Sequence, residues 1–301
     1  MFERDRSTES VALSRAWCDY FAANRLKADE VPWGDAYRLT PSERQAIQKS
    51  VQQFQLGEGA EGRRLLAGGH AYARAAGDPL IPEALTLFIR EEQRHSAQLL
   101  KFMRLQGIPA VKKHWVDSVF RWVRVLAGLE VELRVLVTAE VIAVPYYQAL
   151  GCATRSALLP AISARILGDE AEHLRFQASM LSRLEARRPR LLRRLIWRAH
   201  QWFLVGTCCV VWIEHRSVFK SAGRSFCELL GDALAEFSGL EAATASKTFA
   251  PPGESGRQES YSEGHDIVEN HQSSSLSTEY MEAPTSGPRC RRLYSGRASS
   301  A

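Results

Sequence analysis

The sequence predicts an all-α protein built around a helical bundle. Over long segments, apolar residues recur at the three- and four-residue spacing of amphipathic helices, and no strand-like alternation bounded by hairpin turns occurs. The helical segments end at turn-forming residues such as Gly77-Asp78-Pro79 and Gly151. The 301 residues are 45% hydrophobic and 24% charged, which is typical of a soluble globular protein.

A first short helix is expected within residues 11–26, and a longer helical pattern covers residues 41–76. The longer pattern begins with a capping box, in which Thr40 is the N-cap, Pro41 takes the first helical position and Glu43 completes the box. Several glycines in this segment would weaken an isolated helix. We therefore expect them to allow close approach of neighbouring helices, at positions 57, 59, 62, 68 and 69.

Four further helices are predicted, at residues 82–106, 117–150, 160–188 and 191–222, with Pro145 as a kink. After residue 240 Ser, Gly, Pro and charged residues predominate, which predicts a disordered tail. The predicted organisation is an N-terminal extension (1–40), a four-helix bundle (41–188), a basic, aromatic-rich helical region (189–240) and the disordered tail (241–301).

Charge and hydrophobicity limit the possible partners. The net charge of +5 is modest, and seven arginines gather between Arg183 and Arg198. Such a run is usually a solvated helix face, so nucleic-acid binding is not expected. The apolar run at 202–213 has twelve residues, against the roughly 20 that cross a bilayer, so it predicts a buried helix or a docking face. Peripheral membrane contact remains an alternative. The charged N-terminus and the absence of Cys-x-x-Cys pairs favour a cytoplasmic location.

Two copies of the motif Glu-x-x-His carry the chemistry: Glu92 with His95, and Glu170 with His173. A proline precedes each of these glutamates by ten residues, so the chain reads as two helical hairpins of the same plan. Residues three apart on a helix point in similar directions, so the carboxylate and the imidazole of each motif can bind one metal.

Each motif has a partner glutamate on the preceding helix, which runs antiparallel. Glu140 lies 30 residues before Glu170, inside the apolar stretch VLVTAEVIAV, where an unpaired carboxylate would cost several kcal/mol. A bound cation removes that cost. Glu61 lies 31 residues before Glu92, and this matching offset favours Glu61 as the first ligand, with Glu58 as the alternative.

Other polar and aromatic residues have plainer interpretations. Solvated charges on helix faces would explain Glu91, Asp169 and Glu172. Tyr146 and Tyr147, two turns beyond Glu140, are interpreted as core residues, with a redox role or a hydrogen bond to a ligand as the alternative. The remaining histidines lack a ligand partner at helical spacing and are expected at the surface or at an interface: His114, His200 and His215.

The segments FIREEQRH, TAEVIAVPYY and ILGDEAEH resemble the ferritin-like superfamily, whose familiar members are rubrerythrin and ferritin, over roughly residues 45–185. The resemblance implies a ferritin-like four-helix bundle that holds two metal ions. The implied ligands are Glu61, Glu92, His95, Glu140, Glu170 and His173. The chain departs from rubrerythrin in having Ala143 one turn after Glu140, where a further glutamate would stand, and in lacking a rubredoxin-like module.

These features predict a di-iron oxidoreductase that activates dioxygen or peroxide, with two Fe ions, or Fe and Mn, as cofactors. A small-molecule substrate and an electron donor would complete the reaction. Two alternatives are iron storage with ferroxidase activity, and a metal-stabilised binding module that docks a partner through the basic helix at 191–222. A homodimer is a further possibility.

Overall fold

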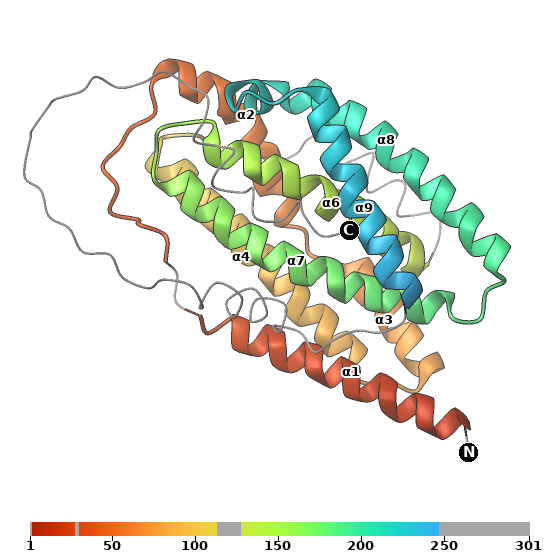
Figure 1. The fold of residues 1–301 in the computed structure, drawn as a ribbon. Helices are drawn as coiled ribbons and strands as arrows, with labels where there is room; N and C mark the ends of the chain where they lie inside the picture. Colours follow the sequence, from red (N-terminus) through yellow and green to blue (C-terminus); the bar gives the residue numbers. More distant parts are fainter. Residues whose placement is uncertain (1, 28–29, 113–127, 247–301) are drawn as a thin grey trace, which may run out of the picture. The chain divides into compact units, whose positions relative to one another are not determined.

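The computed structural model describes residues 2–27, 30–112 and 128–246. All regular secondary structure in this part of the chain is helical, which confirms the all-α prediction. The helices are α1 (Phe2–Asn24), α2 (Pro41–Glu58), α3 (Arg63–Ala76), α4 (Ile81–Leu105), α6 (Leu129–Cys152), α7 (Leu158–Glu185), α8 (Arg190–Ser221) and α9 (Phe226–Ser246) (Figure 1).

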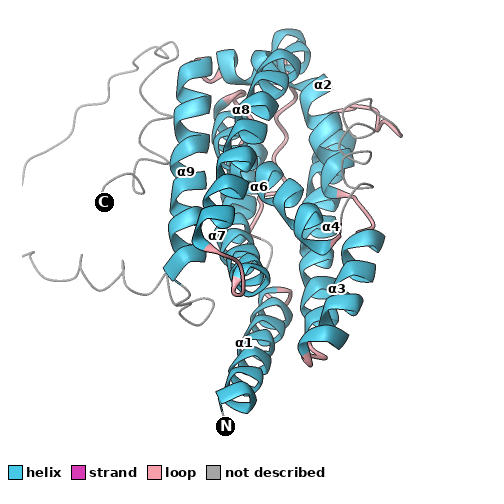
Figure 2. Ribbon diagram, turned by 90° about the vertical axis from the view of Figure 1, so that its right-hand side faces the viewer, coloured by secondary structure: helices cyan, strands magenta, loops and turns pink. Residues whose placement is uncertain are grey.

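Helices α2, α4, α6 and α7 surround the centre of the molecule. The consecutive helices α6 and α7 pack along each other, α4 packs against both α2 and α7, and the remaining helices lie outside this group. Helix α1 lies along α4, α3 bridges α4 and α6, α8 covers α2 and α6, and α9 crosses α6 and α7 (Figures 1 and 2). The predicted N-terminal extension therefore contributes a helix to the packed core, where Trp17 and Phe21 are buried.

Helix α2 begins as its sequence predicts. The Thr40 side chain accepts a hydrogen bond from the backbone N–H of Glu43, at 3.3 Å, and the Glu43 carboxylate accepts one from the backbone N–H of Thr40, at 2.9 Å. Both hydrogen bonds of a capping box are present, which confirms that prediction.

The predicted helix over residues 41–76 is in fact two helices, α2 and α3, separated by residues 59–62. Gly62 adopts a left-handed conformation with φ +61°, and a Cβ atom there would clash with the Ile89 side chain of α4. Gly69 fulfils the expected role of allowing close approach, since a Cβ atom at this position would overlap Leu85. The glycine-rich stretch thus both interrupts the helix and brings α3 against α4.

Helix α6 forms the core of the fold. By length and composition it is the one described helix that could cross a membrane, but 72% of its most apolar window is buried inside the protein, as expected for a central helix. Pro145 lies inside this helix. The N-terminal part of the predicted helix 117–150 lies outside the described residues, since α6 begins at Leu129.

Helix α8 matches the prediction for residues 191–222 to within one residue, and the chain then turns back into α9. Helix α9 continues to Ser246, with Leu240 and Thr244 buried, so the predicted tail boundary at residue 241 is too early. The rest of that tail lies outside the described residues.

Two histidines that were expected at the surface or at an interface are buried where α8 packs on the other helices. His200 is held between Thr138, 2.9 Å from its Nε2, and Arg134, and His215 Nδ1 lies 2.8 Å from the Ser50 hydroxyl. Burial, assisted by the nearby Arg134 charge, lowers the pKa of His200 to about 3, so this side chain is neutral. Both therefore serve the packing of α8 on the bundle. His114 lies outside the described residues.

Candidate metal site

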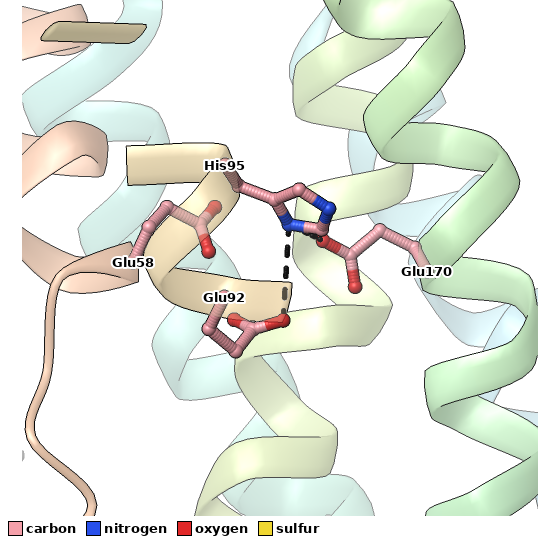
Figure 3. Close-up of side chains that lie close together, drawn as sticks. All are labelled: Glu58, Glu92, His95 and Glu170. Atoms are coloured by element: carbon pink, nitrogen blue, oxygen red, sulfur yellow. Dashed lines mark ion pairs between the residues drawn. The ribbon is translucent and has the colours of Figure 1, made fainter. Parts of the chain in front are cut away.

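Six carboxylate and imidazole side chains from four helices meet at the centre of the bundle. They form two groups, each with its donor atoms within 4.8 Å of one another: Glu58, Glu92, His95 and Glu170 in one (Figure 3), and Glu92, Glu140, Glu170 and His173 in the other. Glu92 and Glu170 belong to both groups. Each group has one further glutamate and one histidine of its own.

The two Glu-x-x-His motifs place their side chains as the helical spacing predicts. In α7, His173 Nδ1 lies 3.3 Å from Glu170 Oε2 and 2.9 Å from Glu92 Oε1 across the helix interface. In α4, His95 Nδ1 lies 3.8 Å from Glu92 Oε1 and 3.6 Å from Glu170 Oε1 (Figure 3). The Nδ1 atoms of both histidines therefore face the shared carboxylates.

The structure brings Glu58 to the site and leaves Glu61 outside it. Glu58 is the last residue of α2 and is buried, and its carboxylate belongs to the first group of donors. Glu61 lies in the connection to α3, where its side chain is 66% exposed and pairs with Arg63. The preference for Glu61, based on its offset from Glu92, therefore does not agree with the geometry, and the alternative Glu58 does.

Helices α4 and α7, which carry the two Glu-x-x-His motifs, are called the motif helices here. The Nε2 atom of each histidine contacts a carboxylate on the other motif helix. His95 Nε2 lies 3.0 Å from Asp169 Oδ2, and His173 Nε2 lies 3.1 Å from Glu91 Oε2. Asp169 and Glu91 each directly precede the shared glutamate of their own helix. With Nε2 donating to the carboxylate, Nδ1 keeps its lone pair and can bind a metal.

The sequence had indicated that Glu91 and Asp169 are solvated charges on helix faces. This interpretation is wrong, because both residues are only 3% exposed. Asn24, near the end of α1, joins them by donating to Glu91 Oε1 at 2.6 Å and to Asp169 Oδ1 at 2.8 Å. Arg94 contacts the same two carboxylates, at 3.0 and 2.9 Å. Glu172 is also buried, beside Arg175.

Asn24 was not predicted from the sequence. It lies 67 residues from Glu91 and 145 from Asp169. No local spacing connects these positions, so only the packing of α1 on the bundle reveals the contact.

Glu58 and Glu140, which each belong to only one of the two groups and are called the terminal glutamates here, each contact a further polar side chain. The Tyr147 hydroxyl donates to Glu58, and Gln177 Nε2 donates to Glu140 Oε1 at 3.1 Å. Tyr147 and Tyr146 are fully buried core residues, as predicted, and Tyr147 also makes the alternative predicted contact with a candidate ligand. These hydrogen bonds hold the carboxylates of Glu58 and Glu140 in position toward the centre of the site.

The buried carboxylates repel one another. Burial and the nearby Glu140 raise the pKa of Glu92 well above its usual value, and the same two causes raise the pKa of Glu170. Burial lowers the pKa of His173, but the adjacent Glu92 and hydrogen bonds to carboxylates outweigh it, so this pKa lies well above its ordinary range. A cation among these groups would remove the repulsion.

Two buried polar atoms of the site that lack hydrogen-bond partners within the described part of the chain support a cation-binding role. His95 Nδ1 and Glu170 Oε1 are buried and have no hydrogen-bond partner among the described residues. Leaving such atoms unpaired costs free energy, and a metal ion between them would satisfy both. The donor set of four carboxylates and two imidazoles suits hard, redox-active ions such as Fe and Mn.

Comparison of the chain with models of known families, with curated proteins and with solved structures found no match.

Proposed function

We propose that this protein is a ferritin-like dimetal carboxylate protein. Two iron ions, or iron and manganese, would bind between α2, α4, α6 and α7. Glu92 and Glu170 would contribute to both ligand sets. Glu58 and His95 would complete the first set, and Glu140 and His173 would complete the second. The observation that carries the proposal is the sharing of Glu92 and Glu170 between two groups of donors that each also contain one histidine and one terminal glutamate.

The proposed reaction is the reduction of dioxygen or peroxide, coupled to oxidation of a small-molecule substrate, with electrons from an external donor. A pair of bound iron ions would supply the redox chemistry. The chain would hold the carboxylates in place through Tyr147 and Gln177, and would orient the histidines through Asp169 and Glu91. Aromatic side chains beside His173, namely Phe21 and Phe88, exclude water from one side of the site.

The proposal is tested by loading the metal-free protein with Fe(II) under anaerobic conditions and measuring bound metal by elemental analysis. We expect about two ions per chain, the number that this ligand set holds. Glu140→Ala should bind clearly less metal, whereas Glu61→Ala should retain the full amount. Full metal content in Glu140→Ala would refute the assignment.

Admission of oxygen to the iron-loaded protein distinguishes the possible activities. An oxidoreductase should consume oxygen, develop the absorption of an oxidised iron pair and keep about two ions per chain in excess iron. Continued uptake far beyond that number would instead identify an iron-storage protein.

A further inference from the structure

The exposed apolar side chains of this protein are concentrated on one helix. Among the described residues, every large hydrophobic side chain that is exposed to solvent lies on α8 except Leu26. The exposed fractions are 69% for Leu191, 45% for Leu192, 58% for Leu195, 75% for Trp202 and 64% for Ile213. Single exposed leucines are ordinary, but a helix that collects nearly all of them indicates an interaction surface.

Four of these residues form a single stripe. The steps between Leu191, Leu195, Trp202 and Ile213 are 4, 7 and 11 residues, each a sum of three- and four-residue steps. At 100° per residue these side chains lie within about 40° of one another around the helix. The stripe is roughly 33 Å long, at 1.5 Å per residue. The opposite side of α8 packs on the bundle through buried residues such as Leu204 and Phe219. Figure 1 shows α8 along the edge of the bundle.

The charges carried by this stretch of α8 itself all have one sign. Residues 186–213 contain six arginines and no aspartate or glutamate. Arg194 and Arg198 are exposed next to Leu195 and Trp202. The first carboxylate after this segment, Glu214, is paired with Lys49 at 2.9 Å. The stripe is therefore both apolar and basic.

We propose that the outer face of α8, defined as Leu191, Leu195, Arg194, Arg198, Trp202 and Ile213, binds the surface of a membrane that contains anionic lipids. The helix would lie in the plane of the membrane, with the leucines and the tryptophan entering the boundary between headgroups and acyl chains. The arginines would contact lipid phosphates, since basic residues near an anionic membrane surface are attracted to it.

Other partners fit this face less well. A second copy of the chain would bring arginines against arginines, or against Arg216 and Lys220 at the far end of α8, which are also exposed. A nucleic acid would match the arginines but would leave the exposed leucines without a partner. A membrane surface that is anionic outside and apolar beneath complements both properties at once.

Sedimentation with lipid vesicles tests the proposal. The full chain is mixed with vesicles of phosphatidylcholine alone, or of phosphatidylcholine with phosphatidylglycerol. We expect binding to the anionic vesicles only, and a smaller bound fraction as the salt concentration rises, because salt screens exposed charges.

Variants of exposed residues localise the binding surface without disturbing the core. The double variant Leu195→Ser with Trp202→Ser should lose binding by roughly tenfold or more, since both apolar groups would leave the membrane. Arg194→Gln with Arg198→Gln should also bind more weakly and should show a shallower dependence on salt. The control is Leu26→Ser, which removes an exposed leucine outside α8 and should bind like the unaltered protein.

A fluorescence measurement adds an independent check. Lipids with brominated acyl chains should quench tryptophan fluorescence in the unaltered protein, and Trp202→Phe should remove that quenching while vesicle binding persists. Several outcomes would overturn the proposal. They are no binding to anionic vesicles, equal loss of binding in Leu26→Ser, and a dimer or a nucleic-acid complex that the Leu195→Ser, Trp202→Ser variant abolishes.

Discussion

His95 on α4 and Asp169 on α7 are joined across the helix interface, with 3.0 Å between the Nε2 and Oδ2 atoms. His173 on α7 and Glu91 on α4 repeat this relationship in the opposite direction, at 3.1 Å. Each motif helix thus orients the histidine of the other. The sequences Glu91-Glu92 and Asp169-Glu170 combine an orienting carboxylate and a candidate ligand in adjacent positions.

The first prediction concerns these orienting carboxylates. Asp169→Asn and Glu91→Gln should each weaken metal binding by about 10- to 100-fold, because the amide no longer fixes the imidazole tautomer. The measurement is competition for metal with a chelator of known affinity. Glu172→Gln is the control, since Glu172 is also a buried acid of α7 but contacts Arg175. Unchanged affinity in the first two variants would show that Glu91 and Asp169 do not orient the histidines for metal binding.

The second prediction concerns the ligand from α2. Glu58→Ala should lower metal content from about two ions to about one, because Glu58 belongs to only one of the two donor groups. Glu61→Ala should bind the full amount, since Glu61 is exposed. Elemental analysis of both purified variants measures the difference. Loss of metal in Glu61→Ala, with full metal content in Glu58→Ala, would show that Glu61 is the ligand.

The contrast between Glu58 and Glu61 shows where the sequence was informative and where it was not. The spacing within each Glu-x-x-His motif is local and helical, so it predicted that these four side chains share one region, and the structure places them together. The 31-residue offset assumed an unbroken helix before the turn, but α2 ends at Glu58 and α3 begins at Arg63. Residue counting across that break no longer measured helical turns.

The outer contacts of the site depended on tertiary packing. The charges of Glu91 and Asp169 looked like a solvated helix face, because the sequence does not reveal that α1 covers them and supplies Asn24. In contrast, the burial of Glu140 followed from its apolar neighbours alone. An apolar surrounding sequence is thus a better sign of a buried acid than its position on a helix.

The third prediction concerns pH. Burial and mutual repulsion raise the pKa of Glu92 and Glu170 in the folded, metal-free protein. The folded state then binds more protons than the unfolded state, so above the unfolded pKa of about 4.3 this protein should lose stability as pH rises. Metal binds the deprotonated carboxylates, so the rise in Tm on metal binding should grow with pH over the same range.

Thermal unfolding of metal-loaded and metal-free protein at a series of pH values measures this difference. Comparing the two forms cancels groups outside the site, such as His200, whose lowered pKa has the opposite effect below its unfolded value of about 6.5. In Glu92→Gln the rise in Tm on metal binding should depend less steeply on pH. A rise in Tm that is independent of pH would contradict the assignment of these carboxylates as ligands.

The last prediction concerns the two sides of α8. Leu204 is fully buried against the bundle, whereas Leu195 is 58% exposed on the same helix. Leu204→Ala should lower the free energy of unfolding by about 2–5 kcal/mol, because it leaves a cavity in the core. Leu195→Ala should change it by less than about 0.5 kcal/mol, as is usual for surface positions. Urea denaturation of both variants measures the difference. If Leu204→Ala were as stable as the unaltered protein while Leu195→Ala was not, then the side of α8 assigned to the membrane would be the one that packs on the bundle.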